Sequence, residues 1–377
     1  MSESSDRRTT SSGTSSPTAA DPDGFAAPAA INRVASTRPA VRDSDFPTLQ
    51  AVLDSVELGK QISLLPASQW SWGIPQEVRI EVLKRDGAMN CTLEIAVRTE
   101  SGWHPLIGKV YANDKRGLRA HGATEGLWRA GFGRDAEASI PQPIAYLPSL
   151  RLLLQEKVEG LEAKEIFKYG DEPLRALAAE RCARWLARFH SLNLPSDRVL
   201  RVEKILARCQ RAHRRISGED GRLAAKSERL YRELEAAALR VEAKPLRPGH
   251  GDFGFHNIYL AGRQTITFDW DLHDAADPAR DVARFIVMLA RLALHRLGSI
   301  RELDGAAEVF LAAYLSAGGA RVTESLPFYE GELYLRGAES DLETRGRQWR
   351  QWTEAMLDEG LRTLEHPVKS EEAGEDV

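Results

Sequence analysis

The sequence has few of the residues that stabilise small secreted proteins, and no segment that would anchor it in a membrane. Only three cysteines occur in 377 residues (Cys91, Cys182 and Cys209), and none forms a CxxC pair. An odd, widely spaced set gives no disulfide framework, so a reducing compartment is expected. No apolar run approaches the roughly 20 residues of a membrane span, and the N-terminus lacks the apolar core of a secretory signal. We therefore expect a cytoplasmic protein without a membrane partner.

A strong excess of charge of one sign is also absent. Lys and Arg number 51 against 55 Asp and Glu, for a net charge of −4. That balance argues against a nucleic-acid partner for the chain as a whole. The segment "RGRQWRQW" (345–352) interleaves basic and aromatic residues, as in single-strand binding surfaces. Because this run is short, we prefer a helix that packs Trp349 and Trp352, and leave contact of its arginines with a substrate open. The oligomeric state is not readable from the sequence.

Both ends of the chain are poor in core-forming residues. Residues 1–44 consist mainly of Ser, Thr, Ala, Pro and Asp, with Phe25 as the one aromatic, and residues 367–377 are acidic. Such segments cannot bury enough apolar surface to offset chain entropy, so both are expected to be disordered. Folded structure is expected from about Phe46.

The first half of the folded region is expected to be rich in strands. Helical periodicity covers 46–58, and alternating apolar residues predict a hairpin over 77–99 with its turn at Asp86-Gly87. A third strand is expected over 104–112, a helix over 116–135, and a further strand over 151–160.

The second half is expected to be mainly helical. Helices are predicted over 174–193, 201–217 and 224–241, and then to about residue 365 after a short hairpin. The sequence therefore predicts an α+β protein of two unequal lobes. The small lobe (45–158) would hold an antiparallel sheet and one main helix, and the larger lobe (159–366) would be mostly helical. A cleft between such lobes is a common ligand site.

Lys109 is the first candidate functional residue. It lies inside the apolar strand "LIGKVY", where an ammonium group must be paired, solvated or used. From the strand alone, a lysine that reaches water at a sheet edge is the simpler interpretation. The functional interpretation is a cation that binds phosphate, held by a carboxylate. Glu125 on the next helix could supply that carboxylate, although it could equally be an exposed helix residue.

The segment "HGDFGFHNIYL" (250–260) carries more information. Asp252 and Asn257 lie five residues apart in a loop, and Asp269 ends the following strand "TITFDWD". Carboxylate and amide oxygens suit a hydroxyl proton and a hard cation. A polar loop with turn-forming Asp and Asn is the alternative for each residue taken alone. The spacing of the set favours a functional site.

Four motifs together resemble the aminoglycoside phosphotransferase and choline kinase family, the small-molecule relatives of protein kinases. "HGDFGFHN" is similar to the family's catalytic loop and parallels the H-R-D-x-x-x-x-N loop of protein kinases. "ITFDWD" resembles its IDW segment, "DPARDVARF" (277–285) the Asp-Pro-x-x-Asp stretch, and "LARFHSL" (186–192) a Leu-Ala-x-Leu-His helix. The resemblance spans about 77–290 and implies a bilobal, protein-kinase-like fold.

The resemblance also implies an activity and a catalytic centre. The γ-phosphate of ATP, with GTP left open, would move directly to a hydroxyl of a small molecule. Asp252 would be the catalytic base, and Asn257 and Asp269 would bind Mg²⁺. Asp271 is a weaker metal candidate. The acceptor is not identified, although the arginine-rich helix 201–216 argues mildly against a polycation.

Further residues would bind the nucleotide or support the loop. Lys109, held by Glu125, would contact the α- and β-phosphates, and the main chain of Glu156 and Val158 would face the adenine. The turn 85–90 would cover the nucleotide, although it lacks a full G-x-G-x-x-G. The resemblance assigns structural roles to two more residues, His250 and Asp281.

Two other functions fit parts of the sequence. His250, His256 and the His273-Asp274 pair could be metal ligands of an HD-type phosphohydrolase, but that family carries its His-Asp pair on a helix, and here the pair follows a strand. A pseudokinase that binds nucleotide without turnover is the other alternative. Against it, each ligand position holds a chemically competent residue.

Overall fold

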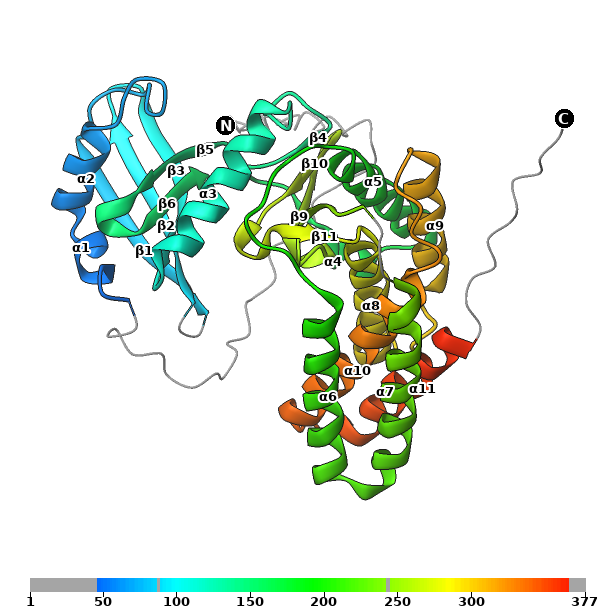
Figure 1. Cartoon of the computed structure of the whole chain (residues 1–377). Helices are drawn as coiled ribbons and strands as arrows, with labels where there is room; N and C mark the ends of the chain where they lie inside the picture. The colour runs from blue at the N-terminus through cyan, green and yellow to red at the C-terminus, as the bar shows by residue number, and fades with distance from the viewer. Residues whose placement is uncertain (1–45, 87–88, 242–244, 366–377) are drawn as a thin grey trace, which may run out of the picture.

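The computed structural model describes residues 46–86, 89–241 and 245–365, and shows two lobes of unequal size (Figure 1). The smaller lobe holds an antiparallel sheet, and the larger one is mainly helical. The predicted bilobal α+β fold is confirmed. The segments 1–44 and 367–377, which were expected to be disordered, lie outside the described residues.

The smaller lobe is the N-lobe and the larger one the C-lobe. The sheet of the N-lobe has five strands in the order β1-β2-β3-β6-β5, and each neighbouring pair is antiparallel. Its strands are β1 (Glu77–Asp86), β2 (Asn90–Thr99), β3 (Gly102–Tyr111), β5 (Pro143–Leu147) and β6 (Leu152–Glu156). The predicted hairpin over 77–99 is confirmed. The register shifts between Val82 and Lys84, and Val82 is exposed there. A bulge therefore ends the simple alternation of β1 near its turn.

The helical periodicity over 46–58 corresponds to helical structure, but not to one continuous helix. Two helices occur instead, α1 (Leu49–Leu53) and α2 (Ser55–Ser63). Asp54 between them is extended, and its side chain accepts hydrogen bonds from the backbone N–H groups of Val56 and Glu57. The first backbone N–H groups of a helix have no partner inside the helix, and a capping carboxylate accepts hydrogen bonds from them. Asp54 therefore starts a new helix although the apolar spacing continues.

The two faces of the N-lobe sheet have different roles. On one face, Leu93, Ile95 and Val97 are buried against α1 and α2. Successive side chains of a strand point to opposite faces, so Lys109 and Tyr111 share the other one. That face packs on helix α3 (Asp114–Arg129), which crosses the sheet toward the larger lobe (Figure 1). Lys109 is thereby directed toward the space between the lobes.

The C-lobe is built from eight helices and two small sheets within the described residues. The helices are α4 (Ala163–Tyr169), α5 (Glu172–His190), α6 (Val202–Glu219), α7 (Gly221–Val241), α8 (Ala279–Arg296), α9 (Asp304–Ser316), α10 (Leu326–Thr344) and α11 (Trp349–Glu365). The small sheets are β4-β10-β9-β7, from Ala138–Ser139, Gln264–Thr267, Ile258–Ala261 and Leu161–Glu162, and β11-β8, from Asp274–Ala276 and Arg247–Gly249. The predicted helices over 174–193, 201–217 and 224–241 are confirmed.

An aromatic centre supports the small sheets of the C-lobe. Trp185 of α5 stacks on Phe253 with ring centroids 5.7 Å apart, and it also contacts Trp270 and Phe189. All four rings are buried. Burying an aromatic or large aliphatic side chain stabilises a fold by roughly 1.5–3 kcal/mol, so this centre gives the hairpin beside it a rigid base.

Helices α6, α7, α10 and α11 form a bundle that extends below the small sheets in Figure 1. At its edge, Trp352 packs on His295 with ring centroids 4.2 Å apart, and Trp349 packs against the main core. Arg347 and Arg350 are exposed. The preferred interpretation of 345–352 holds for the packed tryptophans and the exposed arginines, but the helix begins only at Trp349. No helix of the described residues is long and apolar enough to cross a membrane.

Candidate functional site

The loop between β8 and β9 carries Asp252 and Asn257. It runs from Gly249 through the short 3-10 helix η3 (Phe255–Asn257). Gly251 has φ of +82°, and a Cβ there would collide with the carbonyl oxygen of Leu272. Glycine is therefore needed at this point, because an L side chain fits neither the backbone conformation nor the space.

Asp281, near the start of α8, anchors the backbone of this loop. Its carboxylate accepts hydrogen bonds from the backbone N–H groups of His250 (2.6 Å) and Gly251 (3.0 Å). Burial opposes ionisation of Asp281, but the charge of Arg280 and a hydrogen bond from His190 hold its pKa well below the usual range. The His250 ring lies 4.5 Å from Trp270, and its Nε2 lies 3.1 Å from the Phe268 carbonyl oxygen. Asp281 and His250 thus hold the loop against the aromatic centre.

Asp269 follows β10 in a left-handed conformation with φ of 72°. Asp and Asn tolerate this region better than other non-glycine residues. The Lys109 ammonium lies 2.6 Å from Asp269 Oδ1 and 3.4 Å from Asp271 Oδ1. Burial opposes protonation of Lys109, but the two carboxylates outweigh it and raise the lysine pKa. The structure thus brings Lys109 of the N-lobe to the hairpin of the C-lobe.

Asp271 is buried and held by two residues that the sequence interpretation missed. The Tyr111 hydroxyl donates to Asp271 Oδ1 at 2.6 Å, and Asn90 Nδ2 donates to Asp271 Oδ2 at 2.6 Å. Asn90 and Tyr111 are partners in the ladder between β2 and β3. Two features could have identified these residues. Tyr111 shares a strand face with Lys109, and the β2–β3 register places Asn90 beside Tyr111.

Glu125 does not pair with Lys109, contrary to the sequence prediction. Its carboxylate lies 2.6 Å from Arg129 Nη2 and 3.5 Å from His121 Nε2, one turn away on either side along α3. Lys109 instead uses Asp269 and Asp271 as its carboxylates. The local i,i+4 partners of Glu125 compete with a partner on the sheet, and in this structure they hold it.

Asn257 lies beside the end of β10. Its backbone oxygen accepts from the Phe268 N–H at 3.0 Å, which places it next to Asp269. Its side-chain Nδ2 donates to the Asp252 carbonyl oxygen at 3.1 Å, so Oδ1 is directed away from that bond. The amide oxygen of Asn257 and the carboxylate of Asp269 are the candidate oxygen ligands at this end of the hairpin, and together they are an oxygen set.

This oxygen set fits Mg²⁺ in its usual protein environment. In proteins Mg²⁺ is usually coordinated by one or two carboxylates, several water molecules and phosphate oxygens of the substrate. It therefore does not need a site made of protein ligands alone. Within the described ranges, no group of three or more His, Cys, Asp and Glu side chains could hold a metal ion. Asp274, which the HD-type alternative would use, instead forms two 2.7 Å hydrogen bonds with Arg280.

Asp252 has two positively polarised neighbours. Arg284 of α8 forms an ion pair with Oδ1, and His256 Nε2 lies 3.5 Å from Oδ2. Burial opposes ionisation, but the hydrogen bond from His256 and the charge of Arg284 lower the pKa of Asp252 to about 2. Asp252 is therefore ionised at neutral pH. Arg284 was missed as a site residue, although it lies inside the motif 277–285.

The residues expected around the adenine lie where the lobes join. The Glu156 backbone N–H donates to the Gln142 carbonyl oxygen at 2.9 Å, and its carboxylate lies 2.7 Å from Arg134. Val158 lies in the connection between β6 and β7. Part of the turn 85–90 lies outside the described residues.

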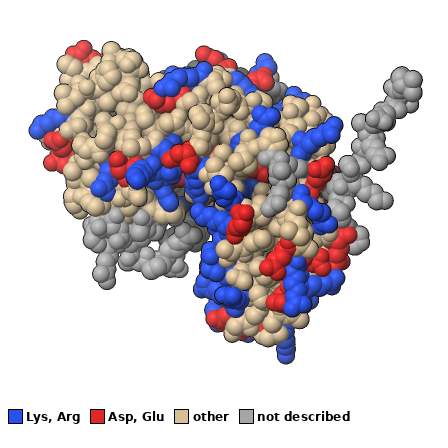
Figure 2. Space-filling view, in the orientation of Figure 1, with Lys and Arg blue, Asp and Glu red and all other residues tan. Residues whose placement is uncertain are grey.

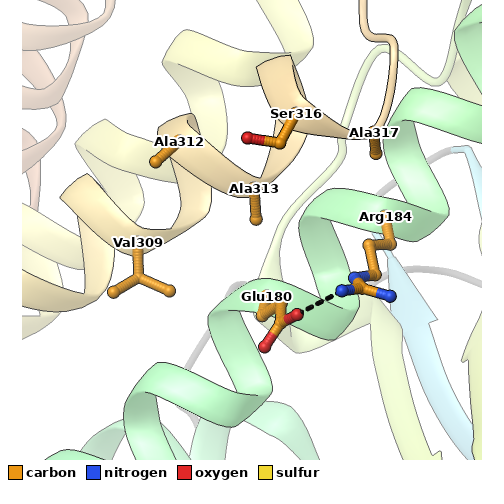
Figure 3. Close-up of a pocket in the computed structure, with 7 residues that line it drawn as sticks. All are labelled: Glu180, Arg184, Val309, Ala312, Ala313, Ser316 and Ala317. Carbon is orange, nitrogen blue, oxygen red and sulfur yellow. Dashed lines mark hydrogen bonds and ion pairs between the residues drawn. The ribbon is translucent and has the colours of Figure 1, made fainter.

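A separate pocket of about 490 Å³ lies between α5 and α9 (Figure 3). It is lined by Glu180, Arg184, Val309, Ala312, Ala313, Ser316 and Ala317. Glu180 and Arg184 pair at 2.6 Å, and the remaining side chains are small. None of the predicted site residues lines this pocket. The candidate site therefore remains the cluster around Lys109, Asp252 and Asp269.

Comparison with known protein families shows which family the chain belongs to. The model of the phosphotransferase enzyme family (APH) matches residues 113–325, more than half of the chain. The chain belongs to this phosphotransferase family. No curated protein sequence matched the chain significantly.

Solved structures similar to this phosphotransferase share its fold at low sequence identity. A choline/ethanolamine kinase family protein from Mesorhizobium loti is 15% identical over 83% of this chain and 95% of its own, with a TM-score of 0.54. Spectinomycin phosphotransferase APH(9)-Ia, in complex with ADP and spectinomycin, is 12% identical over 83% and 98%, with a TM-score of 0.53. The GDP and kanamycin complex of APH(2")-IIia is 12% identical over 79% and 97%, with a TM-score of 0.51.

Proposed function

We propose that this phosphotransferase moves the γ-phosphate of ATP to a hydroxyl group of a small molecule by direct in-line transfer. The observation that carries the proposal is the contact of Lys109 with Asp269, beside Asn257 and Asp252. It joins a phosphate-binding cation from one lobe to oxygen ligands from the other. Family membership supports phosphoryl transfer as the reaction class.

Two groups of residues would bind the phosphates of the nucleotide. Lys109 would contact the α- and β-phosphates, and the oxygens of Asn257 and Asp269 would hold Mg²⁺. When bound, Mg²⁺ would supply positive charge that offsets the negative charge developing on the phosphates. Asp271, which is fixed by Asn90 and Tyr111, would hold the Lys109 ammonium in position for the phosphates.

Asp252 would orient the attacking hydroxyl. With a pKa of about 2 it is a weak proton acceptor at neutral pH, where an efficient general base has a pKa near the working pH. Its contribution would therefore be an ionised oxygen that accepts a hydrogen bond from the acceptor and aligns it with the phosphate. His250 and Asp281 would act through the loop, as positioning residues.

The nucleotide base would lie against the main chain of Glu156 and Val158. One similar structure holds ADP and another holds GDP, so the fold accommodates either purine. We propose ATP as the donor and treat GTP as a measurable alternative.

The test is phosphate transfer measured across a panel of hydroxylated small molecules. ATP or GTP with Mg²⁺ is supplied with each acceptor, and both nucleotide diphosphate and phosphorylated acceptor are quantified. Omitting the acceptor or Mg²⁺ provides the control. Transfer that requires both supports the proposal. Nucleotide binding without any transfer across the panel would instead favour a pseudokinase.

A further inference from the structure

Two side chains on one face of α8 contact the loop that carries Asp252. Asp281 accepts hydrogen bonds from the backbone N–H groups of His250 and Gly251. Arg284, one turn later, forms an ion pair with Oδ1 of Asp252. Residues three or four positions apart lie on the same face of a helix, so these two side chains reach the loop together. Helix α8 therefore holds both the backbone of the loop and the side chain expected to orient the acceptor.

Met288 extends this contact by another turn of α8. A Cβ atom on Gly254 would lie 2.5 Å from Met288 Sδ and 3.1 Å from the ring of His256. The absence of a side chain at Gly254 thus lets Met288 approach the loop closely. Along the helix, the ion pair of Arg284 is therefore flanked by a packed contact on either side.

Arg284 is partly enclosed, unlike the cationic side chains that cover the surface of the helical bundle. Figure 2 shows Lys and Arg side chains on that surface, interspersed with Asp and Glu. The Arg284 side chain is 27% exposed, and its buried Nε has no hydrogen-bond partner among the described residues. Among the same residues, Asp252 is the one carboxylate at ion-pair distance from Arg284. Because this pair is partly buried, solvent and salt screen it less than a surface pair.

The two oxygens of the Asp252 carboxylate have different surroundings. Oδ1 is buried and paired with Arg284, whereas Oδ2 lies 3.5 Å from His256 Nε2. The Asp252 side chain is 21% exposed, and the buried Oδ1 does not contribute to that exposure. A carboxylate oxygen can accept two hydrogen bonds, so the long contact with His256 leaves Oδ2 able to accept another. Oδ2 is therefore the oxygen that an acceptor hydroxyl can reach.

We propose that Arg284 is a positioning residue for phosphoryl transfer, which holds Asp252 through Oδ1 so that Oδ2 receives the acceptor hydroxyl beside His256. This inference rests on the proposed phosphotransferase function. The terminal torsion of an aspartate side chain is broad, so a carboxylate held at one oxygen keeps the other in a fixed direction. Holding a group in its productive geometry lowers the barrier, and a misplacement of about 1 Å can slow a reaction roughly a hundredfold. Arg284 would thus act on the rate through Asp252.

The first experiment measures single-turnover transfer in Arg284→Gln and Arg284→Lys, with ATP, Mg²⁺ and the best acceptor. Arg284→Gln should slow transfer by roughly tenfold to a hundredfold and leave the Kd for ATP within about twofold of the wild type. Arg284→Lys keeps a cation beside Asp252, so it should recover most of the lost rate. A wild-type rate in Arg284→Gln would overturn the inference.

Arg291→Gln is the matched control on the same helix. Arg291 also pairs with a buried carboxylate, that of Asp341, at 2.5 Å. Loss of either ion pair should lower stability, but only Arg284→Gln should slow transfer. An equal loss of rate in the two variants would show that transfer depends on the packing of α8, and would contradict a specific role of Arg284.

Combining Arg284→Gln with Asp252→Asn tests whether Arg284 acts through Asp252. If it does, the two effects are not additive, and the double variant should transfer phosphate at nearly the rate of Asp252→Asn. A further loss as large as the one in the wild-type background would mean that Arg284 acts on the phosphates or the acceptor directly. That result would overturn the positioning role.

The place of the acceptor is tested at His256. His256→Trp narrows the space beside Oδ2, so the KM for the acceptor should rise by roughly fivefold or more while the Kd for ATP stays within about twofold. An unchanged KM would contradict the assignment of Oδ2 to the acceptor.

Urea titration tests the ion pair if no acceptor in the panel is phosphorylated. The unfolding midpoints of the wild type, Arg284→Gln, Asp252→Asn and the double variant show whether the two substitutions are additive. Non-additive shifts support the ion pair on which the inference depends, and additive shifts overturn it. Failure of the phosphotransferase proposal would appear separately, as nucleotide binding without transfer by the wild type.

Discussion

The Lys109 ammonium lies 2.6 Å from Asp269 Oδ1, although the two residues are 160 positions apart in the sequence. One comes from the middle of the N-lobe sheet and the other from the end of the C-lobe hairpin. Asp271 adds a second carboxylate at 3.4 Å. The contact joins the two lobes through charges that the reaction itself would use.

Replacement of Lys109 by methionine should weaken nucleotide binding. Lys109→Met keeps much of the side-chain volume but leaves the carboxylates of Asp269 and Asp271 without a cation. We expect the Kd for ATP with Mg²⁺ to rise by roughly tenfold or more, since a charged hydrogen bond contributes about 1.5–3 kcal/mol. Calorimetric titration measures it. Lys226→Met is the matched control, because Lys226 also lies between two carboxylates, Glu354 and Asp358, but on the surface. Equal Kd values for the two variants would contradict the assignment.

Loss of the Tyr111 hydroxyl should destabilise the protein. Tyr111→Phe removes one of the three N-lobe donors to Asp271, leaving a buried carboxylate oxygen less satisfied. The free energy of unfolding should fall by about 1.5–3 kcal/mol in urea titration. Tyr231→Phe is the control, since that hydroxyl donates to Glu235 at the surface and its loss should cost less than about 0.5 kcal/mol. A Tyr111→Phe variant as stable as the Tyr231→Phe control would show that Asp271 does not need this donor.

Asparagine and alanine at position 269 should have different effects on stability. Asp269 has φ of 72°, which Asn adopts more readily than Ala. Both variants should lose Mg²⁺-dependent ATP binding, and Asp269→Ala should also be less stable than Asp269→Asn by about 1 kcal/mol. Thermal unfolding and ATP titration with and without Mg²⁺ separate the two effects. Retained Mg²⁺ dependence in Asp269→Asn would argue against its role as a metal ligand.

Asp281 should make stability depend on pH in the acid range. Its folded-state pKa lies below the unfolded value of about 3.9, so its contribution is fully present above that value and is lost as pH falls toward the folded pKa. The free energy of unfolding should therefore decline below about pH 5. Asp281→Asn should flatten that decline and cost about 3 kcal/mol at pH 7, because Arg280 and two N–H groups lose a buried carboxylate.

Asp197→Asn is the control for this pH series. The hydrogen bond from Arg119 lowers the pKa of Asp197, but its side chain is exposed, so solvent screens the interaction. Urea titrations from acid to neutral pH should give nearly the wild-type slope for this variant. If the free energy of unfolding of Asp281→Asn fell at low pH as steeply as that of the wild type, the titrating group would be another residue.

The sequence was most informative where the signal is local. Asp252 and Asn257 share one loop, and Asp269 follows one hairpin later, so short-range spacing was enough to bring them together. The β1–β2 hairpin followed from alternation of apolar residues, and Lys109 was notable because it lies inside an apolar strand segment. Periodicity over 46–58 indicated helical structure but not the break at Asp54, whose side chain caps a new helix.

Contacts that depend on how elements pack could not be predicted in the same way. The helical position of Glu125 was known, but which face of α3 meets Lys109 depends on how α3 lies on the sheet. Asn90 reaches Asp271 across 181 positions, and no local pattern indicates such a pair. Arg284 was inside a predicted motif, yet its ion pair with Asp252 depends on the angle between α8 and the loop.

The most direct test of the account is single-turnover transfer of the γ-phosphate, measured in the wild type and in Asp252→Asn with the best acceptor. Asp252→Asn should bind ATP and Mg²⁺ within a few fold of the wild type, because Lys109, Asn257 and Asp269 are unchanged. Its transfer rate should fall by at least roughly a hundredfold. Transfer by the variant at the wild-type rate would contradict the role of Asp252 and the site built around it.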